Sequence, residues 1–135
     1  MNTLVGLHSL WRWVVLLVMV VALVRGLLSW LRGGAWTGAD RRLFLLATTA
    51  IDLQVVFGLV LYVAQRSWGA SVFIAYVHPL IMLVALAVVH IFGARAKRAS
   101  TPTVQYRTLA LGFALALFLV TAAIPAYSWS RAWYA

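Results

Sequence analysis

The sequence predicts an all-α protein: a transmembrane four-helix bundle with up-down-up-down topology and both termini extracytoplasmic. Three observations favour this fold. The 135 residues are 65% hydrophobic and 10% charged, whereas soluble domains average roughly 45–50% apolar and about 25% charged residues. Four apolar runs each reach the roughly 20 residues that a helix needs to cross a bilayer. Basic residues gather between particular runs, and this asymmetry indicates the orientation.

The four apolar runs predict one integral membrane domain over residues 1–135. We expect spans at approximately 4–30, 43–64, 72–94 and 108–127. The links between them contain helix-breaking and charged residues and read RGGAWTGADRR, QRSWGAS and RAKRASTPTVQYR. Links this short make consecutive helices antiparallel neighbours, which gives a bundle. The first run has neither a basic start nor a small-residue cleavage site, so we expect it to be a span rather than a cleaved signal.

The basic residues predict which links face the cytoplasm. Eight flank the first and third links: Arg25, Arg32, Arg41, Arg42, Arg95, Lys97, Arg98 and Arg107. Only Arg12, Arg66 and Arg131 lie on the other side, so the two basic links are predicted to be cytoplasmic. The net charge of +9 therefore indicates topology and contact with anionic lipids rather than nucleic acid. The absence of cysteine excludes disulfides, thiolate metal sites and haem attached through Cys-x-x-Cys-His.

Two histidines are expected at the same depth on parallel helices. His8 precedes Arg25 by 17 residues, and His78 precedes Arg95 by the same number. If both arginines reach the inner interface, the two imidazoles lie level in the outer leaflet. Imidazoles on facing helices suit the two axial positions of haem b iron. The sequence therefore predicts His8 and His78 as iron ligands of an electron-transfer protein.

Other residues of the predicted outer half fit a haem site. Gly58 of the second span, with residues 121–123 of the fourth, would let backbone approach a flat porphyrin. Arg12 lies one turn from His8 on the same helix face and could pair with a propionate, as could Arg66 or Arg131 from the rim. A zinc or copper site would need three or four ligands, and this half offers two histidines, no thiolate and no carboxylate. No nucleophile motif accompanies the histidines, so an electron-transfer or accessory role is favoured over a stand-alone enzyme.

Asp52 is predicted near mid-membrane in the second span, where an ionisable side chain is costly. It would either hold a proton or pair with Arg12 or a histidine, and Gln54 adds polarity nearby. A functional interpretation is proton relay to a redox centre or a hydrogen bond to a histidine ligand. The structural alternative is an ion pair that fixes helix packing.

Each histidine also has a structural alternative. His8 could be solvated at the interface, because polar side chains near helix ends are cheap. His78 precedes Pro79, so it could bind a carbonyl group that the proline leaves free. His90 lies near the inner end of the third span, where a polar contact close to the headgroups is expected.

Five segments, LHSLWRW, DLQVVFGLVLY, VHP, VVH and IPAYSW, together resemble a family of small four-helix bacterial membrane proteins of the cytochrome b or cytochrome b561-like type. The resemblance covers most of the chain, and it departs at Val77, where the family often has glutamate. It implies a multi-pass protein of the bacterial inner membrane, with lipids and other membrane subunits or a redox partner around it. It adds His90 to the cofactor-binding residues. The family's histidine and polar positions are occupied here by His8, His78, His90, Arg12, Asp52 and Gln54.

Other functions are compatible with the same sequence. The chain could be a cofactor-free accessory or scaffold subunit of a respiratory or photosynthetic membrane complex, since it has short links and no soluble domain. A pigment or a quinone could replace haem. Proton or ion translocation through Asp52 is a third possibility, although few other polar groups would line a path.

Overall fold

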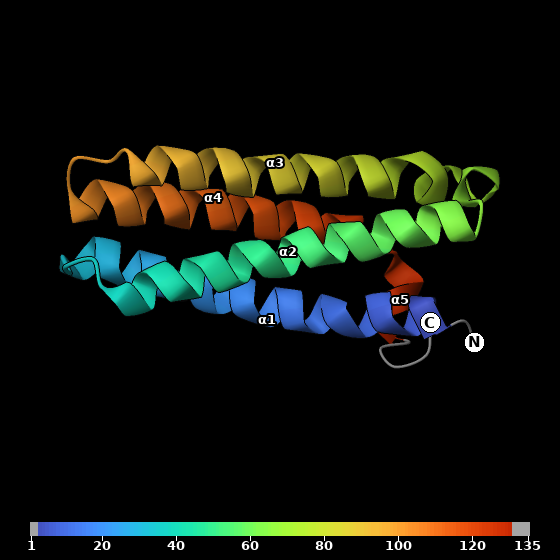
Figure 1. The fold of residues 1–135 in the computed structure, drawn as a ribbon, viewed down its shortest axis with the longest axis horizontal. Coiled ribbons are helices and arrows are strands. Elements are labelled where there is room, and N and C mark those ends of the chain that lie inside the picture. The colour runs from blue at the N-terminus through green and yellow to red at the C-terminus, as the bar shows by residue number, and fades with distance from the viewer. Residues whose placement is uncertain (1–2, 131–135) are drawn as a thin grey trace.

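Four long helices form the computed structural model, which describes residues 3–130. Figure 1 shows that consecutive long helices run antiparallel. The long helices are α1 (Thr3–Arg32), α2 (Gly38–Ala64), α3 (His78–Lys97) and α4 (Pro102–Ala123). A 3₁₀ turn, η1 (Ser67–Gly69), and a π-helical turn, η2 (Phe73–Val77), lie between α2 and α3, and a short α5 (Ala126–Ser130) follows α4. The all-helical prediction is confirmed, and the described residues contain no β-strand.

The four helices are long and apolar enough to cross a membrane, with η2 and α3 counting as one span, Phe73–Lys97. Their packing reverses the pattern of a soluble protein. Large apolar side chains face outward, for example Leu17 at 65% and Phe118 at 68% exposure. Small residues let membrane helices approach closely. Five alanines are fully buried: Ala22, Ala47, Ala85, Ala116 and Ala123.

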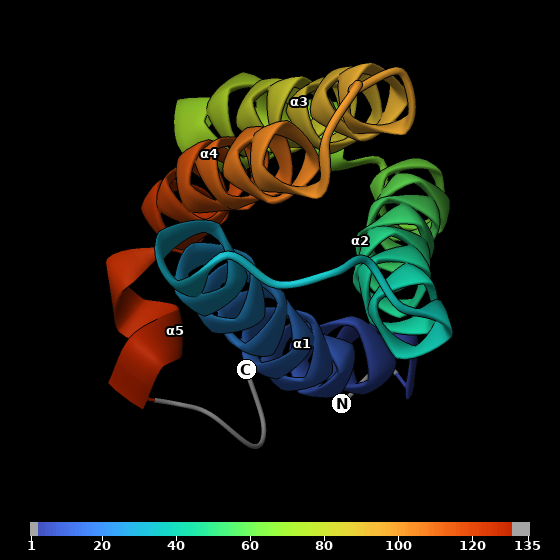
Figure 2. The ribbon, with the colours of Figure 1, turned by 90° about the vertical axis from the view of Figure 1, so that its left-hand side faces the viewer.

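The helices are not equally close to one another. Figure 2, viewed along the bundle, shows α4 beside α1 and α3, while α2 stands apart from α3 over much of its length. Gly26 of α1 marks the α1–α4 approach, because a Cβ atom there would lie 3.3 Å from Ala110 Cβ. The seam between α2 and α3 is the loosest of the four between neighbouring helices.

Several helix boundaries differ from the predicted spans, and two of the differences have a clear local cause. Helix α2 begins at Gly38, five residues before the predicted span, because Thr37 and Asp40 form a reciprocal capping box. Helix α4 ends at Ala123, before the predicted residue 127. Pro125 lacks a backbone N–H and disfavours helical geometry at Ile124, which is extended here.

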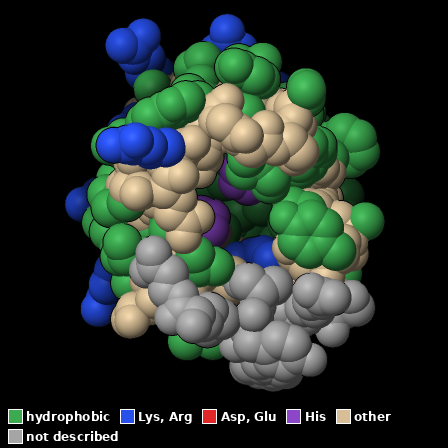
Figure 3. Space-filling view, turned by 90° about the vertical axis from the view of Figure 1, so that its right-hand side faces the viewer, with side chains coloured by type: hydrophobic (Ala, Val, Ile, Leu, Met, Phe, Trp, Pro, Cys, Tyr) green, Lys and Arg blue, Asp and Glu red, His purple; other side chains and the backbone are tan. Residues whose placement is uncertain are grey.

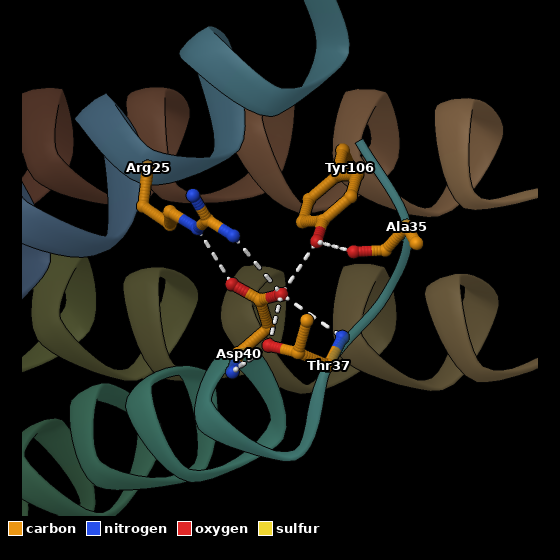
Figure 4. Close-up of polar contacts among 5 residues, drawn as sticks. All are labelled: Arg25, Ala35, Thr37, Asp40 and Tyr106. Atoms are coloured by element: carbon orange, nitrogen blue, oxygen red, sulfur yellow. Dashed lines mark hydrogen bonds and ion pairs between the residues drawn. The ribbon is translucent and has the colours of Figure 1, made fainter. Parts of the chain in front are cut away.

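A polar cluster, drawn in Figure 4, ties α1, α2 and α4 together near the α1–α2 connection, which lies at the end of the bundle away from α5 (Figure 1). Asp40 of α2 is 2% exposed and accepts hydrogen bonds from Arg25 Nε at 2.6 Å and Arg25 Nη2 at 3.3 Å. Tyr106 of α4 donates to Asp40 Oδ2 at 2.5 Å, and Thr37 Oγ1 donates to the same oxygen, which Arg25 Nη2 also contacts, at 2.7 Å. The buried carboxylate is thereby fully partnered by α1, α4 and its own N-cap.

Candidate functional site: a cavity between two histidines

A cavity of about 240 Å³ opens at the end of the bundle where α1 begins and α4 ends. Figure 3 faces this end and shows a hollow with histidine and basic side chains inside it. Its wall is mostly apolar, as expected of a ligand site with a few placed polar groups. Polar residues of α1, α2 and α3 line it, namely His8, Ser9, Arg12, Gln54, Tyr62 and His78, and Gln65, Ser67, Tyr127 and Ser128 add to them from the α2–α3 connection and α5.

The predicted histidine pair meets at this cavity. The ring centroids of His8 and His78 are 6.2 Å apart, and the ring planes are 82° apart. Two imidazoles on opposite sides of one metal ion, with metal–nitrogen bonds of about 2.0–2.1 Å, would have centroids roughly 6.4 Å apart. The observed separation therefore matches the spacing expected for two imidazoles that share one metal ion, and the two rings are nearly perpendicular.

His78 is oriented by the end of α4. Its Nδ1 lies 2.7 Å from the carbonyl oxygen of Ala123, a group left without a helical partner where α4 stops. Because a carbonyl only accepts, Nδ1 carries the proton and Nε2 is left as the free acceptor. This arrangement is typical of a histidine whose second nitrogen binds a metal.

The backbone carbonyl that Pro79 leaves free is not bonded to His78, the partner considered from the sequence. The proline cannot donate to the preceding turn, and the backbone there forms η2. The carbonyl oxygen of Ala75, four residues before the proline, accepts a 3.0 Å hydrogen bond from the Tyr62 hydroxyl. The group freed by Pro79 is therefore satisfied by Tyr62 of α2, and His78 is available to Ala123.

His8 is seated against Gly58 of α2. A Cβ atom at Gly58 would lie 3.2 Å from His8 Cε1, so glycine makes room for this ring. The amide nitrogen of Gln54 donates to the His8 carbonyl at 3.2 Å and lies 3.5 Å from His8 Nε2. His8 Nδ1 is buried and has no hydrogen-bond partner. Gly58 thus belongs to the predicted site, where it leaves room for the His8 ring.

Arg12 brings a buried positive charge to the same cavity. The residue is 8% exposed, and its Nη2 donates to the Ser128 carbonyl at 3.3 Å. Its guanidinium carbon lies 5.2 Å from the ring centroid of Trp13. Arg12 Nε lacks a hydrogen-bond partner, as does Gln54 Oε1. With His8 Nδ1, three unpartnered buried polar atoms border one cavity, which is typical of a site completed by a ligand or water.

Asp52 and His90 are not brought to this cavity. They pair with each other, with His90 Nε2 2.7 Å from Asp52 Oδ1, and their side chains are 40% and 54% exposed. Asp52 therefore has a histidine partner, one of the expected alternatives, and no contact with Arg12. Gln54, two residues along α2, faces the cavity instead.

The remaining predicted residues add no ligand. Arg66 is exposed in the connection between α2 and α3, with a left-handed φ of 52°, and does not line the cavity. Arg131 lies outside the described residues. Within residues 3–130, no group of three His, Asp or Glu side chains comes together, so the cavity offers a metal ion two histidine ligands.

Sequence reasoning missed the cluster around Asp40. Arg25 was interpreted only as a topology signal, although it is the ion-pair partner of Asp40. The spacing Thr37-x-x-Asp40 is the local signal that could have indicated a capping box. Tyr106 is 66 residues away from Asp40 and carries no such signal.

No family model, curated protein or solved structure matches the chain. The function of the cavity is therefore inferred from its own chemistry.

Proposed function

We propose that this protein binds haem b between His8 and His78 and transfers electrons within a membrane. The observation that carries the proposal is the close approach of the two histidine rings, with centroids 6.2 Å apart on two different helices. When bound, haem supplies reversible one-electron chemistry at its iron. The remaining residues bind and orient the group and set its electrostatic surroundings.

Several features of the described residues support such a site. The Ala123 carbonyl holds His78 in the tautomer with a free Nε2. Gly58 leaves space for the ring of His8. Arg12 offers a buried cation with an unpartnered Nε, which suits a propionate carboxylate. The apolar remainder of the wall suits a porphyrin face.

A porphyrin needs space around the two histidines as well as the right distance between them. The cavity is about 240 Å³, below the range of about 300–1,000 Å³ that is typical of ligand pockets. Of the four contacts between neighbouring helices, the one between α2 and α3 is the most loosely packed (Figure 2). The bundle would therefore widen most easily there. Widening there would leave the closer α1–α4 and α3–α4 contacts in place.

The proposal includes an orientation and a location. The last turns of α1 and α3 carry Arg32, Arg95 and Lys97, at the end remote from the cavity. By the positive-inside rule that end faces the cytoplasm, and the haem lies near the outer leaflet of a bacterial inner membrane. The short connections between the four long helices offer little surface for substrate chemistry, so in this proposal the chain passes electrons as a subunit of a larger membrane complex.

Absorption spectra of the detergent-solubilised protein, reconstituted with haem and measured oxidised and reduced, test this function. We expect a Soret band that shifts on reduction and is lost or strongly weakened in His8→Ala and in His78→Ala. His90→Ala is the matched control, because His90 does not line the cavity, and it should keep the wild-type spectrum. A wild-type protein without a haem spectrum, or one unchanged in both variants, would overturn the proposal and favour a cofactor-free accessory subunit.

A further inference from the structure

The pair formed by Asp52 and His90 lies on the outside of the bundle at mid-depth. Asp52 is the fifteenth residue of the 27-residue α2, so it is about 20 Å from either helix end at about 1.5 Å per residue. Its side chain is 40% exposed and that of His90 is 54% exposed. In a membrane, these polar groups would face the hydrocarbon core from the outer side of the α2–α3 seam.

Ionisable side chains at this depth rarely face lipid, because exposure to hydrocarbon is costly. The internal 2.7 Å contact uses His90 Nε2 and Asp52 Oδ1. Within the described residues, the other ring nitrogen and the other carboxylate oxygen make no hydrogen bond. When Nε2 and Oδ1 share a proton, the remaining ring nitrogen is an N–H donor and the remaining carboxylate oxygen is an acceptor. The face therefore presents one unused donor and one unused acceptor.

The neighbouring residues of α3 allow another helix to approach this pair. Ala87 and Ala94, about one turn on either side of His90, are exposed. A Cβ atom at Gly93 would have nothing within 4 Å. Small residues at a membrane helix face permit close contact between backbones, and polar side chains can then bond across the interface.

We propose that this surface, defined by Asp52 and His90 with Ala87, Gly93 and Ala94, binds a second copy of the same chain. The two residues are in contact, so they lie at one depth. A two-fold axis parallel to the helices would bring Asp52 of each copy opposite His90 of the other. The unused Nδ1–H and Oδ2 would then be satisfied twice, as an isologous interface requires.

Self-complementarity selects a second copy over a different partner. A partner of other sequence would need its own acceptor and donor at the same depth, whereas the two-fold copy supplies both from the same residues. The proposal is independent of the haem site, because neither Asp52 nor His90 lines the cavity.

Cysteine cross-linking tests the interface, since the chain contains no native cysteine. Ala87→Cys and Val56→Cys place a thiol one turn from His90 and from Asp52, respectively, on exposed positions. Leu115→Cys is the matched control, an exposed position midway along α4, away from the α2–α3 seam. In liposomes under mild oxidation, we expect a covalent dimer from at least one of the first two and none from the control. No dimer from either, or equal dimer from the control, would overturn the proposal.

A charge-free variant gives a second measurement. Asp52→Leu combined with His90→Leu replaces the pair by side chains that tolerate lipid, so the bundle should fold. We expect the dimer of the wild-type chain, measured by fluorescence energy transfer during dilution with lipid, to weaken about tenfold or more in the double variant. A wild-type protein that is monomeric, an unchanged dimer in the double variant, or a different protein cross-linked at Ala87→Cys would each contradict the homodimer.

Discussion

His78 Nδ1 and the Ala123 carbonyl oxygen are 2.7 Å apart, although the two residues are 45 positions apart in the chain. The hydrogen bond joins the start of α3 to the end of α4. It satisfies a carbonyl that the helix end leaves without a partner and fixes which nitrogen of His78 is free. The stop of α4 before Pro125 is therefore part of the geometry of the histidine site.

Pro125→Ala should weaken the site by releasing this helix end. Alanine would allow α4 to continue, and the Tyr127 N–H could then bond to the Ala123 carbonyl in place of His78. Loss of such a supporting contact typically lowers metal-site affinity about 10–100-fold. Haem titration followed by absorption would show weaker binding. Pro102→Ala, at the first turn of α4, should bind haem as the wild type does; equal affinity in Pro125→Ala would contradict the role of the Ala123 contact.

Gly58→Ala should displace the His8 ring. The new Cβ atom would lie 3.2 Å from His8 Cε1, closer than ordinary van der Waals contact. Overpacking of this kind typically costs about 1–3 kcal/mol. We expect a lower melting temperature in detergent together with a reduced Soret band. Gly69→Ala, where a Cβ atom meets nothing within 4 Å, is the control for both readouts. A Gly58→Ala protein with a wild-type spectrum would show that haem binding does not depend on the contact between His8 and Gly58.

Arg12→Met should lower the reduction potential of the bound haem. The buried guanidinium favours the reduced iron, which carries one less positive charge, so its removal favours the oxidised form. A shift of roughly 60 mV would correspond to a tenfold change in a one-electron equilibrium. Redox titration of the variant measures the sign directly. Arg66→Met, at an exposed position away from the cavity, should leave the potential close to that of the wild type. A potential that rises in Arg12→Met would exclude this electrostatic role.

Asp40→Asn should destabilise the bundle without changing its spectrum. The substitution removes the charge that accepts from Arg25, Tyr106 and Thr37 at the end away from the cavity. Because Arg25 is 45% exposed and can be solvated when unpaired, we expect a loss of about 1–3 kcal/mol. Thermal unfolding monitored by circular dichroism would measure it. Arg42→Gln, which removes only a 3.4 Å contact to the Gly38 carbonyl, should be nearly neutral; equal stability of the two variants would contradict the importance of the cluster.

The depth of the two site histidines could be predicted from sequence because helix rise is constant. Their equal spacing from Arg25 and Arg95 placed them level before any contact was known, and the rings do meet. What could not be predicted was the support of each ring. His78 depends on where α4 ends, and His8 depends on Gly58 of a different helix. Both contacts join different helices, so no residue spacing in the sequence indicates them.

Asp40 and Asp52, the two aspartates of the chain, show a second limit of prediction from the sequence. Asp52 and Gln54 are two residues apart on a helix, so they point about 160° apart and only one can face the cavity. Helix geometry shows that the two residues face opposite ways but does not say which one faces inward, because apolar residues occur on all sides of α2. Asp40 is buried because three separate elements supply its partners. Asp52 is mid-helix, and its only partner among the described residues is His90.

The central claim, that His8 and His78 bind one haem iron together, is tested most directly by low-temperature electron paramagnetic resonance of the oxidised, haem-loaded protein. Two axial imidazoles make the iron low-spin, and ring planes 82° apart predict the highly anisotropic low-spin signal of perpendicular ligands. The account predicts that signal in the wild type and its conversion to a high-spin signal in His8→Ala or His78→Ala. A high-spin signal in the wild type, or a low-spin signal that persists in both variants, would contradict it.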